Sequence, residues 1–494
     1  MKVVGPGDPG YDKDRQISNA RFDYRPLAIY YCENAEDVAT VIRKAHESKK
    51  TVRIRSGGHQ HEGMCTADGV LLIDLSSINS IDCRVREGLV WIGAGAPLSK
   101  VYVDLWNQGY LFSGGGCGDV HVGGLTQGGG WGPVARQFGL TCDSLVGVEM
   151  VTANGAVVTI SQDGGEEASG LLWALRGGGG GNFGVVTKFC FRLLPWVHAV
   201  YTDVIIKWGD EDLPNEDSLQ QLVLNWIQLF PRDVDTSLTT FMRVGVVDPG
   251  GDRVVIGGRY LGAKTQAQDT MARLLAGQPR PRSADYPGSP TQHETMMATA
   301  EGSEPRLREL LGRRLATLPE YQPGPALLQR ASAEGEPPVN LSETCLGIPI
   351  RHKISSGFAR QQFDLTAVRA LTSVIRNSRA VPGARQYLSL HCLGGMIANY
   401  GTGSAFAFRD RTVLLQYQAW WQPDAPQLDG PCIKWIESFR QNMAPYTDGA
   451  FINFVDRDIA LSEYYKGSMA QLIKVKRHWD PDDWLRFEMS IPSK

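Results

Sequence analysis

The 494-residue sequence has no large excess of charge of either sign and no long apolar run. Its 50 Lys and Arg residues nearly balance 53 Asp and Glu residues, so the formal net charge is −3. This balance gives no electrostatic reason to expect nucleic acid or an anionic membrane surface as a partner. No stretch approaches the roughly 18 consecutive apolar residues of a membrane-spanning helix. We therefore expect a small-molecule substrate and no nucleic-acid or membrane partner, whereas the oligomeric state stays open.

Cysteine is sparse, and metal-ligand motifs are missing from the sequence. The nine cysteines occur singly, without the paired spacing of a zinc site or the pattern of a disulfide-rich protein. The nine histidines include no His-Glu-x-x-His motif, so we expect no metal site. The scattered cysteines indicate reduced thiols with at most one or two disulfides. Residues 1–10 contain no apolar signal segment, which favours a cytoplasmic location and leaves secretion open if a leader was removed.

Glycine, by contrast, is abundant and is concentrated in loops. One loop, residues 53–59, ends in Arg-Ser-Gly-Gly-His59, and a second, residues 114–131, carries Cys117 among nine glycines. Backbone amides in such loops approach anionic ligands closely, and a nucleophilic side chain there can reach a ring on the same ligand. No Gly-x-Gly-x-x-Gly motif opens a βαβ unit near the N-terminus, which disfavours a nicotinamide cofactor. The two loops predict a diphosphate cofactor that is held at two points.

At these residues the sequence resembles the berberine bridge enzyme-like branch of the FAD-linked oxidases, within the vanillyl alcohol oxidase superfamily. The resemblance implies that His59 bonds the 8α-methyl group of FAD and that Cys117 bonds flavin C6. Further similar segments follow in order at 172–187, which contains five consecutive glycines, and at 475–492. The resemblance covers most of the chain. It implies an α+β, two-domain PCMH-type FAD-binding fold with an inserted substrate domain built on an antiparallel sheet flanked by helices.

The domain boundaries follow from a change of pattern along the chain. We expect residues 1–197 to form the first part of the FAD-binding domain, 198–445 the substrate-binding domain, and 446–494 a segment that completes the FAD-binding domain. Short β-branched runs with dense glycine give way to long alternating strands in the middle piece. Besides His59 and Cys117, the expected FAD contacts are Arg55, Ser56, Gly57, Gly58, Gln60, Gly116, Val122, Gly123, Gly124, Gly128, Gly129, Gly179, Gly180, Asn182, Val185, Asn453 and Phe454.

The sequence departs from the resembled family where a substrate proton would be accepted. Family members that oxidise sugars or polyketide alcohols carry a tyrosine in a late Asn-Tyr-x-Asp strand motif, and this chain has Phe454 at the tyrosine position. A second family tyrosine, after the triple glycine, is replaced by Trp131. Neither side chain can act as the base, although both rings can stack on a planar or sugar substrate.

Two strand-like segments of the middle piece offer replacements for the missing tyrosines. Alternation along 414–420 puts Gln416 and Gln418 on one face and Tyr417 on the other. In the segment 387–395, His391 shares a face with other polar residues. We take His391 and Tyr417 as candidate bases and Gln416, Gln418 and Trp131 as further catalytic-site residues, while the alternative is that these polar faces meet solvent.

The resemblance implies hydride transfer from a substrate carbon to flavin N5, loss of the hydroxyl proton to a base, and reduction of oxygen to hydrogen peroxide. A covalently bound flavin stays in place in an open cleft, which suits a bulky substrate. We expect oxidation of a carbohydrate or natural-product hydroxyl to a ketone or lactone. The alternatives are an oxidative cyclase or desaturase of alkaloid or polyketide metabolism, and an inactive binding protein. His61 and His121 could line the cleft or stabilise its loops.

Overall fold

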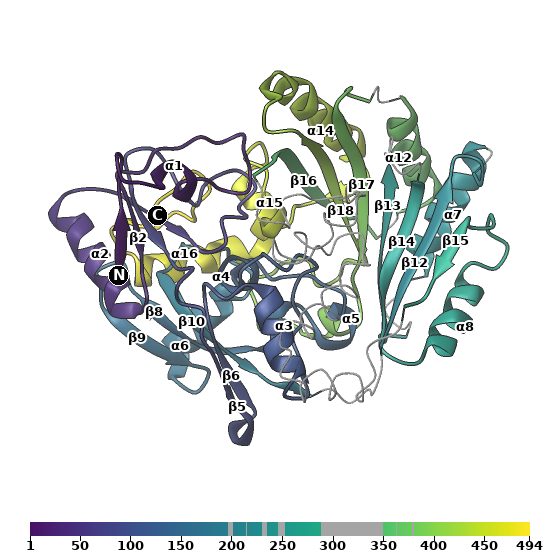
Figure 1. Cartoon of the computed structure of the whole chain (residues 1–494). Helices are drawn as coiled ribbons and strands as arrows, with labels where there is room; N and C mark the ends of the chain where they lie inside the picture. The colour runs from purple at the N-terminus through teal and green to yellow at the C-terminus, as the bar shows by residue number, and fades with distance from the viewer. Residues whose placement is uncertain are drawn as a thin grey trace.

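The computed structural model describes residues 1–195, 201–213, 215–229, 235–245, 252–287, 349–361, 363–377 and 380–494. Two units lie side by side, and both chain ends lie in the same one (Figure 1). That unit contains the first 195 residues together with the C-terminal segment. The other unit is a broad sheet whose outer face is covered by helices (Figure 1). The predicted boundary near residue 197 falls outside the described residues.

The first unit contains two main sheets. In the four-stranded sheet, with order β1-β2-β4-β3, the last three strands are parallel because the amphipathic helix α2 links β2 to β3. The five-stranded sheet, with order β5-β6-β10-β8-β9, is antiparallel. The strands are β1 (Lys2–Val4), β2 (Ala28–Tyr31), β3 (Val52–Arg55), β4 (Leu71–Asp74), β5 (Ile81–Arg84), β6 (Leu89–Gly93), β7 (Tyr110–Leu111), β8 (Leu145–Val151), β9 (Val157–Ser161), β10 (Val185–Arg192) and β11 (Leu194–Pro195). The helices are α1 (Tyr11–Asp14), α2 (Ala35–Glu47), η1 (Val85–Glu87), α3 (Leu98–Trp106), α4 (Val122–Gln127), α5 (Ala135–Phe138), η2 (Thr141–Ser144) and α6 (Gly165–Leu175).

The second unit is built on an eight-stranded sheet, with order β15-β12-β14-β13-β17-β18-β16-β19, in which every described pair is antiparallel. Its strands are β12 (Thr202–Gly209), β13 (Leu238–Gly245), β14 (Asp252–Tyr260), β15 (Ser283–Asp285), β16 (Arg351–Ala359), β17 (Ala384–Cys392), β18 (Val413–Trp421) and β19 (Thr447–Asp448). Its helices are α7 (Glu216–Gln228), α8 (Lys264–Leu274), α12 (Leu365–Asn377), α13 (Met396–Asn399), η5 (Pro426–Leu428) and α14 (Asp429–Met443). An antiparallel sheet flanked by helices is the predicted architecture.

Strand alternation decides which side chains of this sheet face the first unit. Along β18, Leu415, Tyr417 and Ala419 join the apolar core beneath the covering helices. The intervening Gln416 and Gln418 turn toward the first unit and line a cavity there. The period of two along the strand therefore separates a packing face from a polar face.

The C-terminal segment is fixed to the first unit by a buried ammonium group. Lys476 is fully buried, and its Nζ donates to the carbonyl oxygens of Asn182 at 2.9 Å and Leu485 at 2.8 Å. The same Nζ pairs with a carboxylate oxygen of Asp480 at 2.6 Å. A buried charge is tolerated only when it is paired and hydrogen-bonded, so these contacts tie the last helix to the glycine-rich turn before β10. The segment comprises η6 (Ile452–Phe454), α15 (Leu461–Tyr465), η7 (Lys466–Ser468) and α16 (Met469–Trp479).

One local prediction is wrong. The segment with Asn453 and Phe454 was expected to be a strand, but it forms a single 3₁₀ turn, η6. The Asn453 side chain accepts from the Gly130 amide at 3.1 Å and donates to the carbonyl of Gly124 at 3.3 Å. These bonds take the place of strand pairing and hold the turn against the second glycine loop.

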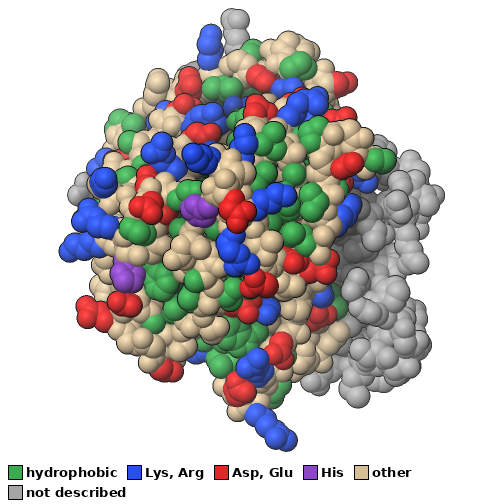
Figure 2. All heavy atoms as spheres, turned by 90° about the vertical axis from the view of Figure 1, so that its left-hand side faces the viewer, with side chains coloured by type: hydrophobic (Ala, Val, Ile, Leu, Met, Phe, Trp, Pro, Cys, Tyr) green, Lys and Arg blue, Asp and Glu red, His purple; other side chains and the backbone are tan. Residues whose placement is uncertain are grey.

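The face of the first unit that Figure 2 presents has no large area of one charge. Figure 2 shows cationic and anionic side chains interspersed over the face it presents. None of the described helices combines the length and the apolar character that a membrane span requires.

Candidate active site

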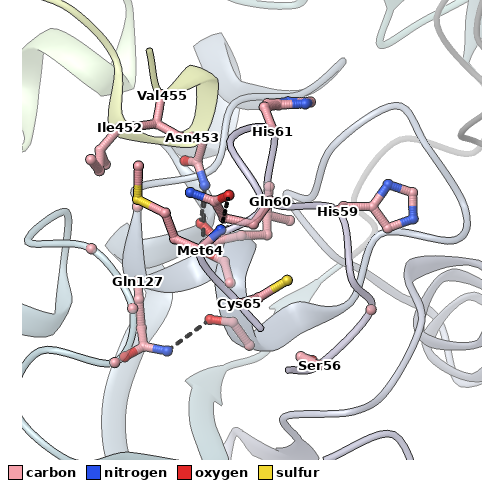
Figure 3. A pocket seen from close by; sticks show the side chains of 18 of the residues that line it. Ser56, His59, Gln60, His61, Met64, Cys65, Gln127, Ile452, Asn453 and Val455 are labelled. Atoms are coloured by element: carbon pink, nitrogen blue, oxygen red, sulfur yellow. Dashed lines mark hydrogen bonds between the residues drawn. The ribbon is translucent and has the colours of Figure 1, made fainter. Parts of the chain in front are cut away.

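A cavity of about 350 Å³ runs between the two units and is lined by side chains from both. The first unit contributes the two glycine loops, the turn before β10, η6 and residues 485–489. The second contributes the polar faces of strands β13, β16, β17 and β18. The volume is within the range of small-molecule sites, and the position between two units is typical of them. Figure 3 shows His59, Gln60 and His61 on one loop of this cavity, with Asn453 and Gln127 reaching it from other segments.

The first loop is held in shape by its own polar contacts. At its start, the buried Arg55 pairs with Asp74 through Nε and Oδ2 at 2.5 Å. Past His59, the Gln60 side chain accepts from the backbone amides of Glu62 at 2.8 Å and Met64 at 2.9 Å. His59 therefore projects from a loop that is fixed on both sides. Arg55 lies outside the described cavity lining, and its ion pair with Asp74 anchors the loop, so its FAD contact stays a prediction.

His59 is uncharged at neutral pH. Burial lowers its pKa to about 3, and the neighbouring His121 and His61 act in the same direction. Neutral imidazole is the nucleophilic form, so the residue is in the state that attachment to flavin requires. His121 lines the cavity too, and its ring packs so closely on Gly57 that a Cβ there would approach ring carbon Cδ2 to 2.8 Å. Only glycine fits at that position of the loop.

Cys117 also lines the cavity, but its sulfur is disulfide-bonded. The seven other described cysteines are free. A sulfur in a disulfide cannot bond flavin C6, because the attacking species is a thiolate. The expectation of mostly reduced thiols is consistent with the seven free cysteines, and attachment of FAD at Cys117 requires that the disulfide first be opened.

Most of the predicted cofactor contacts do line the cavity. Those that do are His59, Cys117, Ser56, Gly57, Gly58, Gln60, Gly116, Gly123, Gly124, Gly128, Gly179, Gly180, Asn182, Val185, Asn453 and Phe454. Val122 lies outside the lining, fully buried in the core of the first unit. Gly129 also lies outside the lining, next to apolar side chains behind the loop, so both contacts stay predictions.

The lining suits an anionic, nucleotide-bearing cofactor. Among its described residues there is no Asp or Glu, whereas Arg53 and Arg486 lie at the end formed by the first unit. At Gly124 an added Cβ would meet nothing within 4 Å, so a side chain there would project into space that a ligand can fill. The buried Oε1 of Gln127 has no hydrogen-bond partner and is available to a ligand donor. These features fit FAD with its diphosphate.

Comparisons with known proteins agree with this assignment. Residues 26–161 match a family model described as an FAD binding domain, and residues 450–492 match one described as berberine and berberine like. The chain therefore contains both of these segments, and it is similar to berberine bridge enzyme-like FAD-linked oxidoreductases. It is 29% identical over 498 residues to the uncharacterized FAD-linked oxidoreductase YgaK of Bacillus subtilis (strain 168), covering 99% of this chain and 96% of that protein.

Solved structures share the fold. A chitooligosaccharide oxidase has a TM-score of 0.79 at 22% identity, covering 100% of this chain and 97% of that one. The berberine bridge enzyme from Eschscholzia californica has a TM-score of 0.79 at 20% identity, with the same coverage of both chains. The predicted α+β, PCMH-type FAD-binding fold is confirmed, and FAD is the cofactor of this oxidoreductase.

On the side of the second unit, a network of hydrogen bonds fixes the polar face of the sheet. Gln418 accepts through Oε1 from the Tyr387 hydroxyl at 3.0 Å and from Trp420 Nε1 at 3.1 Å. Its Nε2 donates to the Ser389 hydroxyl at 3.1 Å. Gln416 accepts through Oε1 from His391 Nε2 at 3.0 Å. Both glutamines line the cavity as predicted, and their oxygens are already engaged.

Neither predicted base of this protein stands in the cavity. Tyr417 does not reach the cavity, because it is fully buried on the opposite face of β18, with its ring 5.0 Å from that of Phe439. Burial raises the pKa of its phenol, which disfavours the phenolate. His391 is buried beside Trp131, at 4.5 Å between rings, and does not line the cavity. Trp131 itself does, with its Nε1 donating to the Cys392 carbonyl at 2.8 Å.

His61 is one of three histidines that line the cavity, with His59 and His121, and its hydrogen bonds define which of its nitrogens carries the proton. His352 Nδ1 lies 3.2 Å from the Ile350 carbonyl, which can only accept, so this nitrogen carries the proton. Because burial holds the pKa of His352 well below its usual value, its Nε2 is unprotonated and accepts from His61 Nδ1 at 3.0 Å. Burial also lowers the pKa of His61 to about 4. The lone pair of neutral His61 therefore lies on Nε2.

The position of His61 relates it to the missing tyrosine. Its ring centroid is 6.2 Å from that of Phe454, which occupies the tyrosine position of the resembled family. Sequence reasoning left His61 undecided between the cleft and a loop-stabilising role, and the structure shows that it lines the cavity. Sequence reasoning missed Arg243 and Ile354 on the cavity wall. The alternation of side chains between the two faces of β13 and β16 would have indicated that these two residues face the cavity.

The buried histidines predict a loss of stability in acid. Unfolded histidines titrate near 6.5, whereas burial lowers the folded pKa of His61 and His121 to about 4 and that of His352 further. Below pH 6.5 the unfolded chain binds more protons than the folded one. Each of these histidines therefore lowers the free energy of unfolding by about 1.4 kcal/mol per pH unit down to about pH 4. Burial raises the pKa of Asp119 to about 7, so this carboxyl group offsets the effect of one histidine. Urea unfolding at pH 7, 6 and 5 measures the slope of the free energy of unfolding against pH.

A pair of variants checks this assignment. His352→Phe should reduce the slope between pH 6 and 5 by about 1.4 kcal/mol per unit, because one such histidine is removed. His478→Gln should leave the slope unchanged, since that side chain is 51% exposed. Equal slopes in the wild type and His352→Phe would show that His352 is not held neutral in the folded protein.

Proposed function

We propose that this protein is an FAD-dependent oxidase that dehydrogenates a hydroxyl group of a carbohydrate or natural-product substrate to a ketone or lactone. Bound FAD would accept the hydride, through N5, and pass the electrons to oxygen, giving hydrogen peroxide. The loop residue His59 would hold the flavin through its 8α-methyl group, and Cys117 would hold it through C6. The observation that carries the proposal is the cavity between the units, which places the attachment loop opposite a substrate wall.

His61 is the proton acceptor of the proposed reaction. A substrate hydroxyl in the cavity would donate to His61 Nε2 and transfer its proton there as the carbinol carbon loses hydride. The resulting imidazolium keeps its Nδ1 bond to His352, so the ring does not have to reorient. Positioned bases of this kind contribute about 10² to 10⁴ in rate. His61 thus replaces His391 and Tyr417 in the role that the sequence had assigned to them.

An oxidative cyclisation or desaturation, the second function predicted from the sequence, rested on the loss of both tyrosines. Because His61 supplies a base within the cavity, that loss no longer argues against alcohol oxidation. Anaerobic screening of oligosaccharides, glycosides, polyketide alcohols and alkaloids for flavin bleaching separates the two functions. Bleaching by alkaloids or cyclisation precursors alone would reject alcohol oxidation.

Covalent attachment of FAD is tested by the mass of the denatured protein. We expect the mass of one added FAD, with both the His59 and the Cys117 peptides modified in the fully attached form. His59→Ala should retain FAD through Cys117 alone, and Cys117→Ser through His59 alone. If the wild type carries FAD on His59 only and the Cys117 peptide is found in a disulfide, the second attachment is rejected. A wild-type chain without added mass would reject both.

A further inference from the structure

His121 is held beside the loop that carries His59. An isolated antiparallel bridge to Pro97 fixes the backbone at His121, and the side chain lines the cavity. Its ring lies against Gly57, where an added Cβ would come within 2.8 Å of ring carbon Cδ2. Because Cδ2 is bonded to Nε2, this nitrogen is on the edge of the ring that faces the His59 loop.

Hydrogen bonding among the described residues does not explain the imidazole of His121. Its Nδ1 is buried and has no hydrogen-bond partner among them. By contrast, His61 Nδ1 is bonded to His352, and the His59 ring donates to the backbone carbonyl of Asp119. Burying an unpaired polar atom costs free energy, and an apolar ring would fill the same space without that cost. The imidazole therefore calls for a chemical role.

The cavity lining limits which group can take a proton from the bound cofactor. No Asp or Glu is among its described residues, and thiols and phenols are protonated at neutral pH. Of the three lining histidines, His59 is the one to be attached, and His61 is bonded to His352 of the second unit. The third, His121, is neutral at pH 7 because burial lowers its pKa to about 4. It is thus the base that lies on the His59 side of the cavity.

We propose that His121 accepts the proton that leaves FAD when His59 becomes attached to the 8α-methyl group. In this step a methyl C–H bond breaks and a bond forms between that carbon and a His59 nitrogen. The proton passes to His121 Nε2, and the electron pair of the C–H bond stays in the flavin. Oxygen then takes up this electron pair with two protons, one from the methyl group and one from the His59 ring, and leaves as hydrogen peroxide. This role of His121 rests on the attachment at His59 contained in the proposed function.

The test measures attachment rather than turnover. Full-length protein with Cys117→Ser, in which His59 is the remaining proposed attachment point, is produced under riboflavin limitation and then mixed with FAD in air. FAD that stays with the denatured protein is followed over time, together with hydrogen peroxide. His121→Phe keeps an aromatic ring and should bind FAD, but attach it about 10²- to 10⁴-fold more slowly. His46→Phe is the matched control and should attach FAD at the parent rate, because His46 lies in the same unit, outside the lining, and stacks on Trp484.

A second variant separates the lost base from lost packing. His121→Gly should attach FAD as slowly as His121→Phe, and added imidazole should restore part of the rate, which lost packing alone would not allow. Attachment at the parent rate in His121→Phe, or no acceleration of His121→Gly by imidazole, would overturn the role of His121 and leave the attachment at His59 intact. A parent protein that binds FAD without attaching it would reject the attachment at His59, and the role of His121 with it.

Discussion

Replacing His61 by phenylalanine is expected to slow anaerobic flavin reduction by the substrate about 10²- to 10⁴-fold, the range of a positioned general base. The variant keeps an aromatic ring beside Phe454 but removes the Nε2 lone pair. The FAD content and the midpoint of thermal unfolding should stay close to those of the wild type. Stopped-flow absorbance, with whichever alcohol of the screening panel bleaches the wild-type flavin, gives the rate.

The matched control is His391→Gln. His391 donates to Gln416 from behind the cavity wall, and glutamine retains a donor for that bond. We expect its rate to stay within a few-fold of the wild-type rate. A fast His61→Phe variant combined with a slow His391→Gln variant would reverse the assignment and return the role of base to His391.

The pH profile offers an independent readout. Because burial lowers the pKa of His61 to about 4, the side chain is unprotonated above that value and able to accept a proton. The rate should therefore fall only as the pH drops toward 4, rather than through the usual histidine range near 6.5. The titratable groups that interact with His61 are His59 and His352; His121 acts on His59, and Arg21 acts on His352. An acid limb near 6.5 would show that His61 is not held neutral as the structure indicates.

The sequence sufficed for the cofactor end of the site. Glycine-rich loops and their bordering nucleophiles are local patterns, so His59 and the glycines around it could be placed without a structure. Strand periodicity was equally informative, because a period of two puts Gln416 and Gln418 on the cavity side of β18 and Tyr417 in the core. Local patterns, however, do not show whether a side chain on the predicted face reaches the cavity or is covered by another side chain. His391 is on the predicted face but sits behind Trp131.

The base could not be predicted because it depends on a contact between distant segments. His61 and His352 are 291 residues apart in sequence, and the proton on each ring is set by the other ring and by the Ile350 carbonyl. The disulfide at Cys117 is another pairing that spacing alone does not give. The structure therefore differs from the sequence-based prediction more in the chemistry of the cavity than in the fold.

The loop that carries His61 is tied to the second unit by a buried ion cluster. Lys353, on β16, is 1% exposed, and its Nζ lies 2.8 Å from Glu62 and 2.6 Å from Asp456. Both carboxylates are fully buried. Burial alone would lower the pKa of Lys353, but Asp456 and Glu62 outweigh it and raise the pKa above its usual value. The ammonium therefore joins three parts of the chain: the loop after His61, the sheet, and the C-terminal segment.

Lys353→Met is expected to destabilise the protein by about 3 kcal/mol, the low end of the range for breaking a buried ion pair. It removes the cation closest to Asp456, which keeps only Arg440 at 3.9 Å, whereas Glu62 keeps Arg457 at 2.9 Å. Urea unfolding followed by circular dichroism measures the change. Lys466→Met is the matched control: Lys466 also contacts two carboxylates, but it is 31% exposed, and its removal should cost about 1 kcal/mol or less.

A double variant separates the lost cation from lost packing. In Lys353→Met/Asp456→Asn one uncompensated charge is removed, so the double variant should be more stable than Lys353→Met alone. If the double variant is less stable, or if Lys353→Met is no more harmful than Lys466→Met, the cluster does not hold the two units together electrostatically. Because Glu62 follows His61 directly, a destabilised cluster should also make the position of His61 less fixed. The flavin reduction rate of Lys353→Met should therefore fall while its FAD content stays close to that of the wild type.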